Sequence, residues 1–146
     1  MKTATETDVT QLNSFLRGEL SAVETYEQAI AKLDDDPALR ARLADCRMSH
    51  QQRAALLRDE ITRRGGEPAE GSGVWGAFAQ LVEGGAKVFG KKAAIAALEE
   101  GEDHGRDDYR AELDNLDSDI RMFVETKLLP EQLRTHDTLS ALKHSL

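Results

Sequence analysis

Apolar residues recur along most of the chain at spacings of three, four and seven residues, which is the period of one face of an α-helix. Over residues 7–33 this stripe consists of Leu12, Phe15, Val23, Tyr26 and Ile30. A similar stripe covers residues 37–64, after an acidic turn in which Asp36 suits the N-cap and Pro37 the first helical position. The pattern therefore predicts two long helices joined by a short turn.

The second half of the chain repeats this arrangement after a glycine-rich interruption. Glycines are frequent over residues 65–90, and the apolar residues among them predict a loop followed by a short amphipathic helix. Helical stripes return over residues 91–113 and 118–143, and the last of these contains Pro130. We therefore expect an all-α protein: one domain, residues 1–146, in which two antiparallel hairpins joined by a long crossover form a four-helix bundle.

The two predicted hairpins resemble each other in sequence. Each first helix contains a Gly-Glu pair and then a tyrosine seven residues after the glutamate, and each second helix contains a histidine preceded by Ser or Thr. The matched residues are Glu19, Tyr26 and His50 in the first hairpin and Glu102, Tyr109 and His136 in the second. Because the matches follow the same order in both hairpins, they predict a pseudo-two-fold bundle.

The repeated acid and histidine fall on the apolar stripes of their helices. Seven residues make about two helical turns, so each glutamate shares a face with its tyrosine. A buried carboxylate is costly unless it is paired, hydrogen-bonded or bound to a metal. Glutamate and neutral imidazole together suit iron, manganese or zinc. The stripes therefore predict a metal site formed by Glu19, His50, Glu102 and His136.

The chain resembles the ferritin-like superfamily, and within it a bacterial branch of short domains of unknown function. The resemblance covers nearly the whole chain and is carried by Leu16-Arg17-Gly18-Glu19, Arg63-Arg64-Gly65-Gly66-Glu67-Pro68, Leu98-Glu99-Glu100-Gly101-Glu102-Asp103 and Glu131-x4-His136-Asp137. It implies a ferritin-like four-helix bundle with two irons, held by one glutamate from each of two helices and a Glu-x-x-His pair from each of the others. Glu19 and Glu102 match the lone glutamates, and His50 and His136 match the histidines.

The glutamates of the two Glu-x-x-His pairs have no match in this chain. An arginine and a leucine stand three residues before the histidines, and the nearest acids are five residues upstream, about 140° around a regular helix. Pro130 favours a kink or π-bulge that would bring Glu131 toward the face of His136. We therefore expect a reduced or asymmetric iron or manganese site, with Glu131 as an additional ligand and with zinc also compatible.

Charge and composition narrow the classes of function. The formal charge of −8 disfavours binding to nucleic acid, since phosphate contacts require clustered Lys and Arg. No apolar run reaches the ~20 residues of a membrane span, and the polar N-terminus does not resemble a secretory signal. The single cysteine, Cys46, cannot form an internal disulfide, which is typical of a reducing compartment. We therefore expect a cytoplasmic protein that binds neither nucleic acid nor membranes.

Two functions from different classes remain open. The first is a ferritin-like protein whose iron or manganese site serves metal handling or a stress response. The second is a metal-free helical binding or scaffold module that oligomerises through the apolar crossover residues 74–89. The repeated inward acid and histidine favour the first, and the incomplete Glu-x-x-His motifs favour the second. A homo-oligomer is expected in both cases, and whether the protein is an enzyme stays open.

Overall fold

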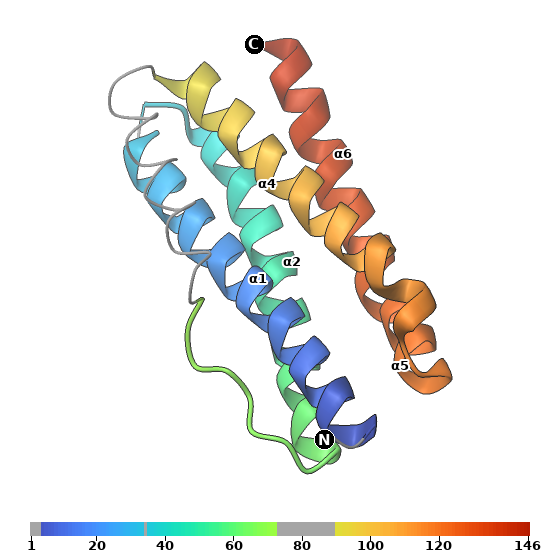
Figure 1. Ribbon diagram of the computed structural model, residues 1–146. Helices are drawn as coiled ribbons and strands as arrows, with labels where there is room; N and C mark the ends of the chain where they lie inside the picture. The colour runs from blue at the N-terminus through green and yellow to red at the C-terminus, as the bar shows by residue number, and fades with distance from the viewer. Residues whose placement is uncertain (1–3, 34, 73–89) are drawn as a thin grey trace.

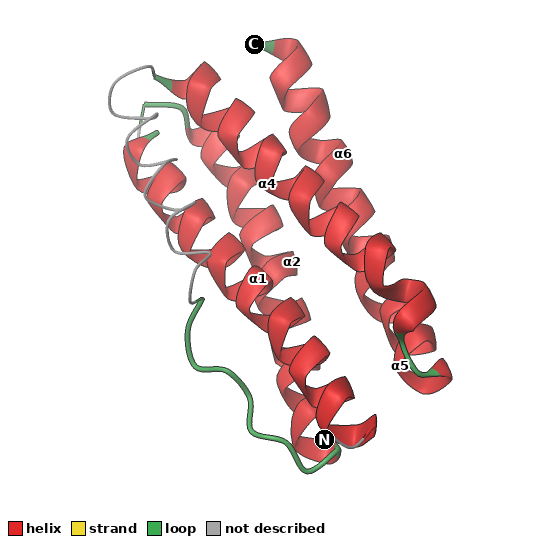
Figure 2. Cartoon of the chain, in the orientation of Figure 1, coloured by secondary structure: helices red, strands yellow, loops and turns green. Residues whose placement is uncertain are grey.

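The computed structural model describes residues 4–33, 35–72 and 90–146, and the regular secondary structure in these ranges is entirely helical (Figures 1 and 2). The elements are α1 (Ala4–Lys32), α2 (Pro37–Arg63), α4 (Lys91–Glu112), a short 3₁₀ turn (Leu113–Asn115), α5 (Ser118–Phe123), the π-helix η3 (Val124–Leu128) and α6 (Leu129–Ser145). The predicted all-α class is therefore confirmed, with bounds within three residues of those predicted. The short helix predicted in the crossover falls largely on residues outside the described ranges.

Local sequence explains where α2 begins and ends. The side chain of Asp36 accepts a hydrogen bond from the backbone N–H of the third helical residue at 3.1 Å, and Pro37 occupies the first helical position. At the other end Gly65 has a φ of 81°. The Gly65 N–H bonds the carbonyl three residues earlier at 3.0 Å, and the Gly66 N–H bonds the one five residues earlier at 2.9 Å. These bonds form a Schellman motif, which directs the chain into the crossover.

The helices pair as two antiparallel hairpins, α1 with α2 and α4 with the segment from α5 to α6 (Figure 1). Between the hairpins, α1 packs against α4 and α2 against α6. In Figure 1, α2 ends beside the N-terminal end of α1, whereas α4 begins at the opposite end of the bundle. The end of α2 and the start of α4 therefore lie at opposite ends of the bundle, as the predicted long crossover requires.

The core of the bundle contains two apolar clusters with a polar layer between them. The cluster near the α1–α2 turn includes Leu33, Leu39, Leu43, Ile95 and Leu139. The cluster at the other end includes Leu12, Leu16, Leu57, Ile120 and Leu128. The layer between them consists of the buried polar side chains Glu19, His50, Arg53, Glu102, Gln132 and Thr135. Because apolar side chains close the core on both sides, these six side chains bond mainly to one another.

The segment that leads into α6 contains one extra residue. Within η3 the N–H of Leu129 bonds the carbonyl of Val124, five residues earlier, and Pro130 follows directly. Proline has no N–H to donate and its ring clashes with the carbonyl four residues earlier, so a wider turn accommodates it. Of the two distortions predicted near Pro130, a kink or a π-bulge, the structure thus has the π-bulge, directly before the proline. It keeps four residues spaced by four on the buried face: Ile120, Val124, Leu128 and Gln132.

Candidate functional site

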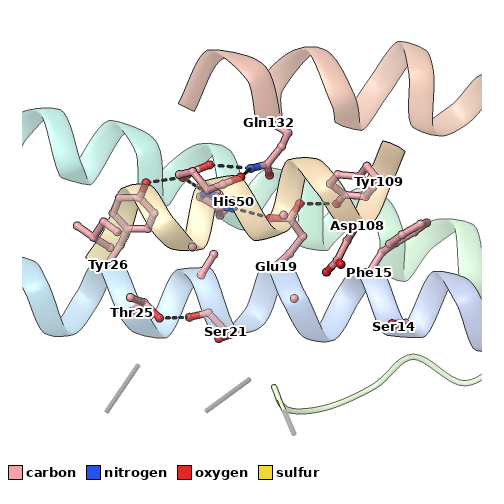
Figure 3. A pocket seen from close by; sticks show the side chains of 16 residues that line it. Ser14, Phe15, Glu19, Ser21, Thr25, Tyr26, His50, Asp108, Tyr109 and Gln132 are labelled. Carbon is pink, nitrogen blue, oxygen red and sulfur yellow. Dashed lines mark hydrogen bonds and ion pairs between the residues drawn. The ribbon is translucent and has the colours of Figure 1, made fainter. Parts of the chain in front are cut away.

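Three of the five predicted metal ligands lie together in the polar layer. Glu19 comes from α1, His50 from α2 and Glu102 from α4, and none of the three is more than 3% exposed. His50 lies between the two carboxylates, with Nδ1 2.5 Å from Glu19 Oε1 and Nε2 2.8 Å from Glu102 Oε2. Figure 3 shows His50 and Glu19 directed toward each other in the space between the helices.

The contacts of His50 define its protonation state. An ionised carboxylate offers only lone pairs, so a ring nitrogen at hydrogen-bond distance from it must carry a proton. Both ring nitrogens of His50 face a carboxylate, at 2.5 and 2.8 Å, and both therefore donate. His50 is thus an imidazolium between two carboxylates.

The charges in the layer shift the pKa of each group in the direction that preserves this arrangement. Burial alone raises the pKa of Glu102, but the charge and hydrogen bond of His50 outweigh burial and lower it to about 2. Burial also opposes ionisation of Glu19, and Arg53 and His50 outweigh it, so this pKa is lowered as well. Burial and Arg53 lower the pKa of His50, whereas the two carboxylates raise it, with a net upward shift. Both carboxyl groups therefore ionise more readily than usual, and the imidazole of His50 holds its second proton to a higher pH than a free histidine does.

Two buried tyrosines bond the carboxylates reciprocally across the hairpins. Tyr26, on the helix of Glu19, donates its hydroxyl proton to Glu102 Oε2. Tyr109, on the helix of Glu102, donates to Glu19 Oε2 at 2.5 Å. Burial, and then the facing carboxylate, raises the pKa of each tyrosine well above its usual value, so both remain neutral donors. The reciprocal bonds agree with the pseudo-two-fold repeat predicted from the sequence.

Arg53 supplies a second buried positive charge. Its side chain is 1% exposed, and its Nη1 lies 3.7 Å from Glu19 Oε2. The same Nη1 donates to Gln132 Oε1 at 2.6 Å, and Nη2 donates to Thr135 Oγ1 at 3.1 Å. Burial lowers the pKa of Arg53, but Glu19 and the other acidic groups raise it further, so the guanidinium stays charged.

Gln132 and Thr135 connect Arg53 to the other carboxylate. Gln132 Nε2 donates to Glu102 Oε1 at 2.8 Å, and Thr135 Oγ1 donates to the same oxygen at 2.7 Å. Gln132 also reaches the backbone carbonyl of Glu102 at 2.9 Å. A Cβ at Gly105 would lie 2.9 Å from Gln132 Nε2, so the glycine leaves room for this approach. The neutral side chains thus link the guanidinium to Glu102.

Glu102 is saturated with hydrogen bonds, and the charges of the layer balance. Glu102 accepts two bonds at Oε2, from His50 and Tyr26, and two at Oε1, from Gln132 and Thr135. Four accepted bonds use the lone-pair sites of a carboxylate. The two carboxylates carry two negative charges, and the two cations, His50 and Arg53, carry two positive charges. The sum is zero, which is the condition under which buried charges are tolerated.

The other two predicted ligands lie outside this layer. His136 Nε2 is 2.6 Å from Asp103 Oδ1 and 3.1 Å from the guanidinium of Arg106, and its side chain is 15% exposed. Glu131 accepts from Ser49 at 3.0 Å and pairs with Arg134 at 2.9 Å on the surface between α2 and α6. The structure therefore does not bring His136 or Glu131 to Glu19 and Glu102.

The sequence reasoning missed Arg53, Gln132 and Thr135. The signal for Arg53 is its position three residues after His50 on the buried stripe of α2, whereas a Glu-x-x-His pair places the glutamate three residues before the histidine. Gln132 and Thr135 are themselves three residues apart, and both are at most 2% exposed. The signal for Gln132 is the four-residue spacing of buried residues that runs through the π-helix from Ile120.

A cavity of about 50 Å³ lies beside the layer. Small residues of α1 and α4 such as Gly18, Ala22 and Gly101 contribute to its lining, and so do Glu19 and Glu102. One water molecule needs ~10–15 Å³ of such space, so the cavity has room for a few. The ionic layer thus has free volume on the side where α1 and α4 meet.

The donor set does not fit a di-iron or dimanganese centre. Within the described ranges, no group of three or more His, Cys, Asp or Glu side chains is arranged to hold a metal ion. The imidazolium of His50 has no free lone pair, and the guanidinium of Arg53 lies 3.7 Å from a carboxylate oxygen that a metal would need. Both features oppose a metal in this arrangement.

The fold and site define an all-helical bundle protein with a buried, charge-balanced ionic layer. The chain belongs to a family described as a domain of unknown function (DUF2383), whose model matches residues 7–115. The matched range includes Glu19, His50, Arg53 and Glu102 and ends before α5. No curated protein and no solved structure matches the chain. None of the helices in the described part of the chain is long and apolar enough to cross a membrane.

Proposed function

We propose that this protein is a metal-free helical binding or scaffold module, in which the ionic layer holds the two hairpins in register. The observation that carries the proposal is the position of His50 between two carboxylates. A metal would have to displace the proton of His50 and break hydrogen bonds to both glutamates. Since those bonds also balance the buried charge, the layer is complete without a metal.

We also propose that the bundle is ferritin-like in arrangement. The long connection from α2 to α4 and the reciprocal tyrosine–glutamate bonds support this relationship. His50-x-x-Arg53 and Gln132-x-x-Thr135 have the three-residue spacing of the Glu-x-x-His pairs in ferritin-like proteins. The chain thus retains the architecture and replaces the metal ligands with hydrogen-bonding groups.

Metal analysis tests the proposed function. Tag-free protein is loaded with iron, manganese or zinc, passed through a desalting column and analysed for metal, and its thermal unfolding is followed with and without a chelator. We expect substoichiometric metal and the same melting temperature in both conditions. One or two equivalents of metal, lost in Glu102→Gln, would contradict the proposal.

One observation favours metal handling as a second candidate. Glu19, His50 and Glu102 reach one site from three helices, beside a cavity of about 50 Å³. If the metal analysis finds stoichiometric iron or manganese, this candidate replaces the first. A role in stress response and a cytoplasmic location stay predictions.

Oligomerisation is the third part of the proposal. The segment predicted to mediate it, residues 74–89, lies outside the described ranges, so the prediction stands on its apolar sequence. Light scattering of the purified protein over a range of concentrations gives the mass. A monomer at all concentrations would contradict it.

A further inference from the structure

We propose that the outward face of α2 is the surface through which this module binds its partner, and that the partner is an acidic protein helix. The inference rests on the proposed function, because it names the surface and the partner chemistry of the proposed binding module. The arginine row of this surface consists of Arg40, Arg47 and Arg58. An uncharged strip beside the row consists of Ala41, Met48 and Ala55.

Positive charge is concentrated in α2. Its sequence contains six arginines and three acidic residues, a surplus of three positive charges, in a chain whose formal charge is −8. By contrast, α1 contains five acids and two cations, and α4 contains seven acids and four cations, so each of these helices has a charge of −3. Only one arginine of α2, Arg53, is used in the ionic layer. The outward face of α2 is therefore a basic surface on an acidic protein, and it attracts acidic groups.

The arginine row has no acidic partner in the part of the chain that the structure describes. The guanidinium groups of Arg40, Arg47 and Arg58 form neither a hydrogen bond nor an ion pair with those residues. The Nε of Arg47 has no hydrogen-bond partner even though this atom is buried. A guanidinium offers five N–H donors in a plane that matches a carboxylate. The row is therefore available to a partner that supplies carboxylates.

The spacing along α2 suits a second helix. Seven and eleven residues separate the members of the arginine row, and both spacings return to within about 20° of one direction around an α-helix. Ala41, Met48 and Ala55 are also seven residues apart; all three are exposed, and Met48 is 56% exposed. The small residues before and after Met48 let a neighbouring helix approach and place an apolar side chain against the methionine.

An acidic helix fits this surface better than other anionic partners do. A helix with apolar residues at the same period contacts the uncharged strip, and its flanking glutamates reach the arginine row. Duplex DNA or an anionic membrane would also meet the negative charge of α1 and α4, which repels it. Two α2 faces packed about a two-fold axis would place their arginine rows side by side, and like charges disfavour such a pair.

The experiment uses the full chain and a synthetic helix as the probe. The probe is a fluorescein-labelled peptide of about 28 residues, long enough to be helical, with leucine and alanine on one face and glutamate on its flanks. A matched peptide has glutamine in place of every glutamate. We expect fluorescence anisotropy to show saturable binding of the glutamate peptide, weakened by salt, and an affinity at least about tenfold lower for the glutamine peptide. Equal affinity for the two peptides would overturn the inference on the wild type alone.

A row variant combines Arg40→Gln, Arg47→Gln and Arg58→Gln. It should bind the glutamate peptide about tenfold more weakly than the wild type, because it loses three ion pairs. Met48→Ser should also weaken binding, since it removes the exposed apolar contact of the strip. Circular dichroism and thermal unfolding verify that these variants keep the fold of the wild type.

The control variant removes the same net charge outside α2, through Arg17→Gln, Lys92→Gln and Arg110→Gln, all at exposed positions. It should bind the glutamate peptide as the wild type does. Equal losses in the row and control variants would overturn the inference, because they would show attraction by net charge alone. Tighter binding of duplex DNA than of the peptide would overturn it as well. So would a wild-type dimer that the row variant alone dissociates, because the partner would then be a second copy.

The outcomes separate this inference from the proposed absence of metal. A metal-free chain that does not bind the glutamate peptide would overturn the inference and leave the metal-free ionic layer intact. Stoichiometric metal in a chain that binds the peptide through the arginine row would overturn the metal-free layer and leave the binding surface intact.

Discussion

His50 carries a proton on each ring nitrogen, and its two N–H groups donate to carboxylates on two other helices. It lies between Glu19 and Glu102, which come from different hairpins, and bonds both of them. Without the second proton, one carboxylate would face a nitrogen lone pair in a buried site, which is unfavourable. Protonation of this residue and association of the hairpins are therefore linked.

The linkage predicts a dependence of stability on pH. The pKa of His50 is raised above its usual 6.5, so its contribution is complete below pH 6.5 and is lost as pH rises through the folded-state pKa. The pKa of Glu102 is lowered from 4.5 to about 2, so its contribution is complete above pH 4.5 and is lost as pH falls toward 2. Stability should be greatest between these limits. On the alkaline side it should decline by up to about 1.4 kcal/mol per pH unit.

Urea unfolding at a series of pH values measures this profile. His50→Gln is the control, because it removes the imidazolium and leaves the surface histidines in place. The decline on the alkaline side should disappear in the control. A wild-type profile that is flat above pH 6.5, or one that His50→Gln leaves unchanged, would contradict the assignment of the proton.

The two tyrosine hydroxyls give a second prediction at this scale. Tyr26→Phe and Tyr109→Phe each remove a buried donor to a carboxylate and leave the ring in place. Hydrogen bonds to charged groups contribute about 1.5–3 kcal/mol, so each variant should lose that much free energy of unfolding. Thr138→Val, which removes an exposed hydroxyl bonded to a backbone carbonyl, is the control. Losses no larger than that of the control would show that the hydroxyls are not bonded as described.

Periodicity predicted the inward acids and His50 but not their partners. A helical stripe indicates which side chains face the core, and Glu19, His50 and Glu102 are indeed buried. It does not indicate which side chain of a neighbouring helix stands opposite, because that depends on how the helices are shifted along one another. Arg53 lies on the buried stripe of α2 itself, but it is charged, so the apolar pattern did not include it. His136 was predicted to face the core, but its side chain bonds Asp103 near the surface.

At the scale of elements, the bounds of the helices were predicted well because their signals are local. The cap at Asp36 and the glycine that ends α2 act within one helical turn of themselves. The effect of Pro130 was predicted only in part. The π-bulge forms, and Gln132 and Thr135 after it lie in the buried layer. Glu131, which was expected to turn inward, pairs with Arg134 on the surface.

The π-helix predicts an unusual tolerance of deletion. Because η3 contains one residue more than a regular helix, deleting the exposed Lys127 should restore an α-helix without rotating the helices on either side. Pro130→Ala must accompany the deletion, since proline would clash inside a regular helix at a cost of about 3 kcal/mol. The double change should give a helical, cooperatively unfolding protein.

Deletion of the exposed Gln51 in α2 is the matched control. It rotates half of a regular helix by about 100° relative to the other half, which turns either His50 or Arg53 out of the layer. Circular dichroism and thermal unfolding compare the two deletions. If the two deletions lower the melting temperature equally, the four-residue spacing from Ile120 to Gln132 does not depend on the extra residue of η3.

At the scale of the molecule, the ionic layer joins the two hairpins by buried polar bonds. Tyr26 bonds the second hairpin, Tyr109 bonds the first, and Arg53 donates to two side chains of α6. Apolar clusters lie on both sides of the layer and supply most of the burial. The layer adds specificity, since a shift of one hairpin along the other by one turn would leave several buried charges unpaired.

Charge balance over the whole layer gives the last prediction. Arg53→Met leaves two carboxylates with one imidazolium and should cost about 3–5 kcal/mol, as expected when one partner of a buried pair is removed. Glu19→Gln leaves the opposite excess and should also be costly. The double variant keeps one carboxylate and one imidazolium, so it should be more stable than the sum of the single losses predicts, with a coupling of about 2–3 kcal/mol. Arg53→Met combined with Glu125→Gln, a surface residue paired with Arg121, should be additive. A double-mutant cycle from urea unfolding measures both couplings, and equal values would mean that the layer is not held by its balance of charge.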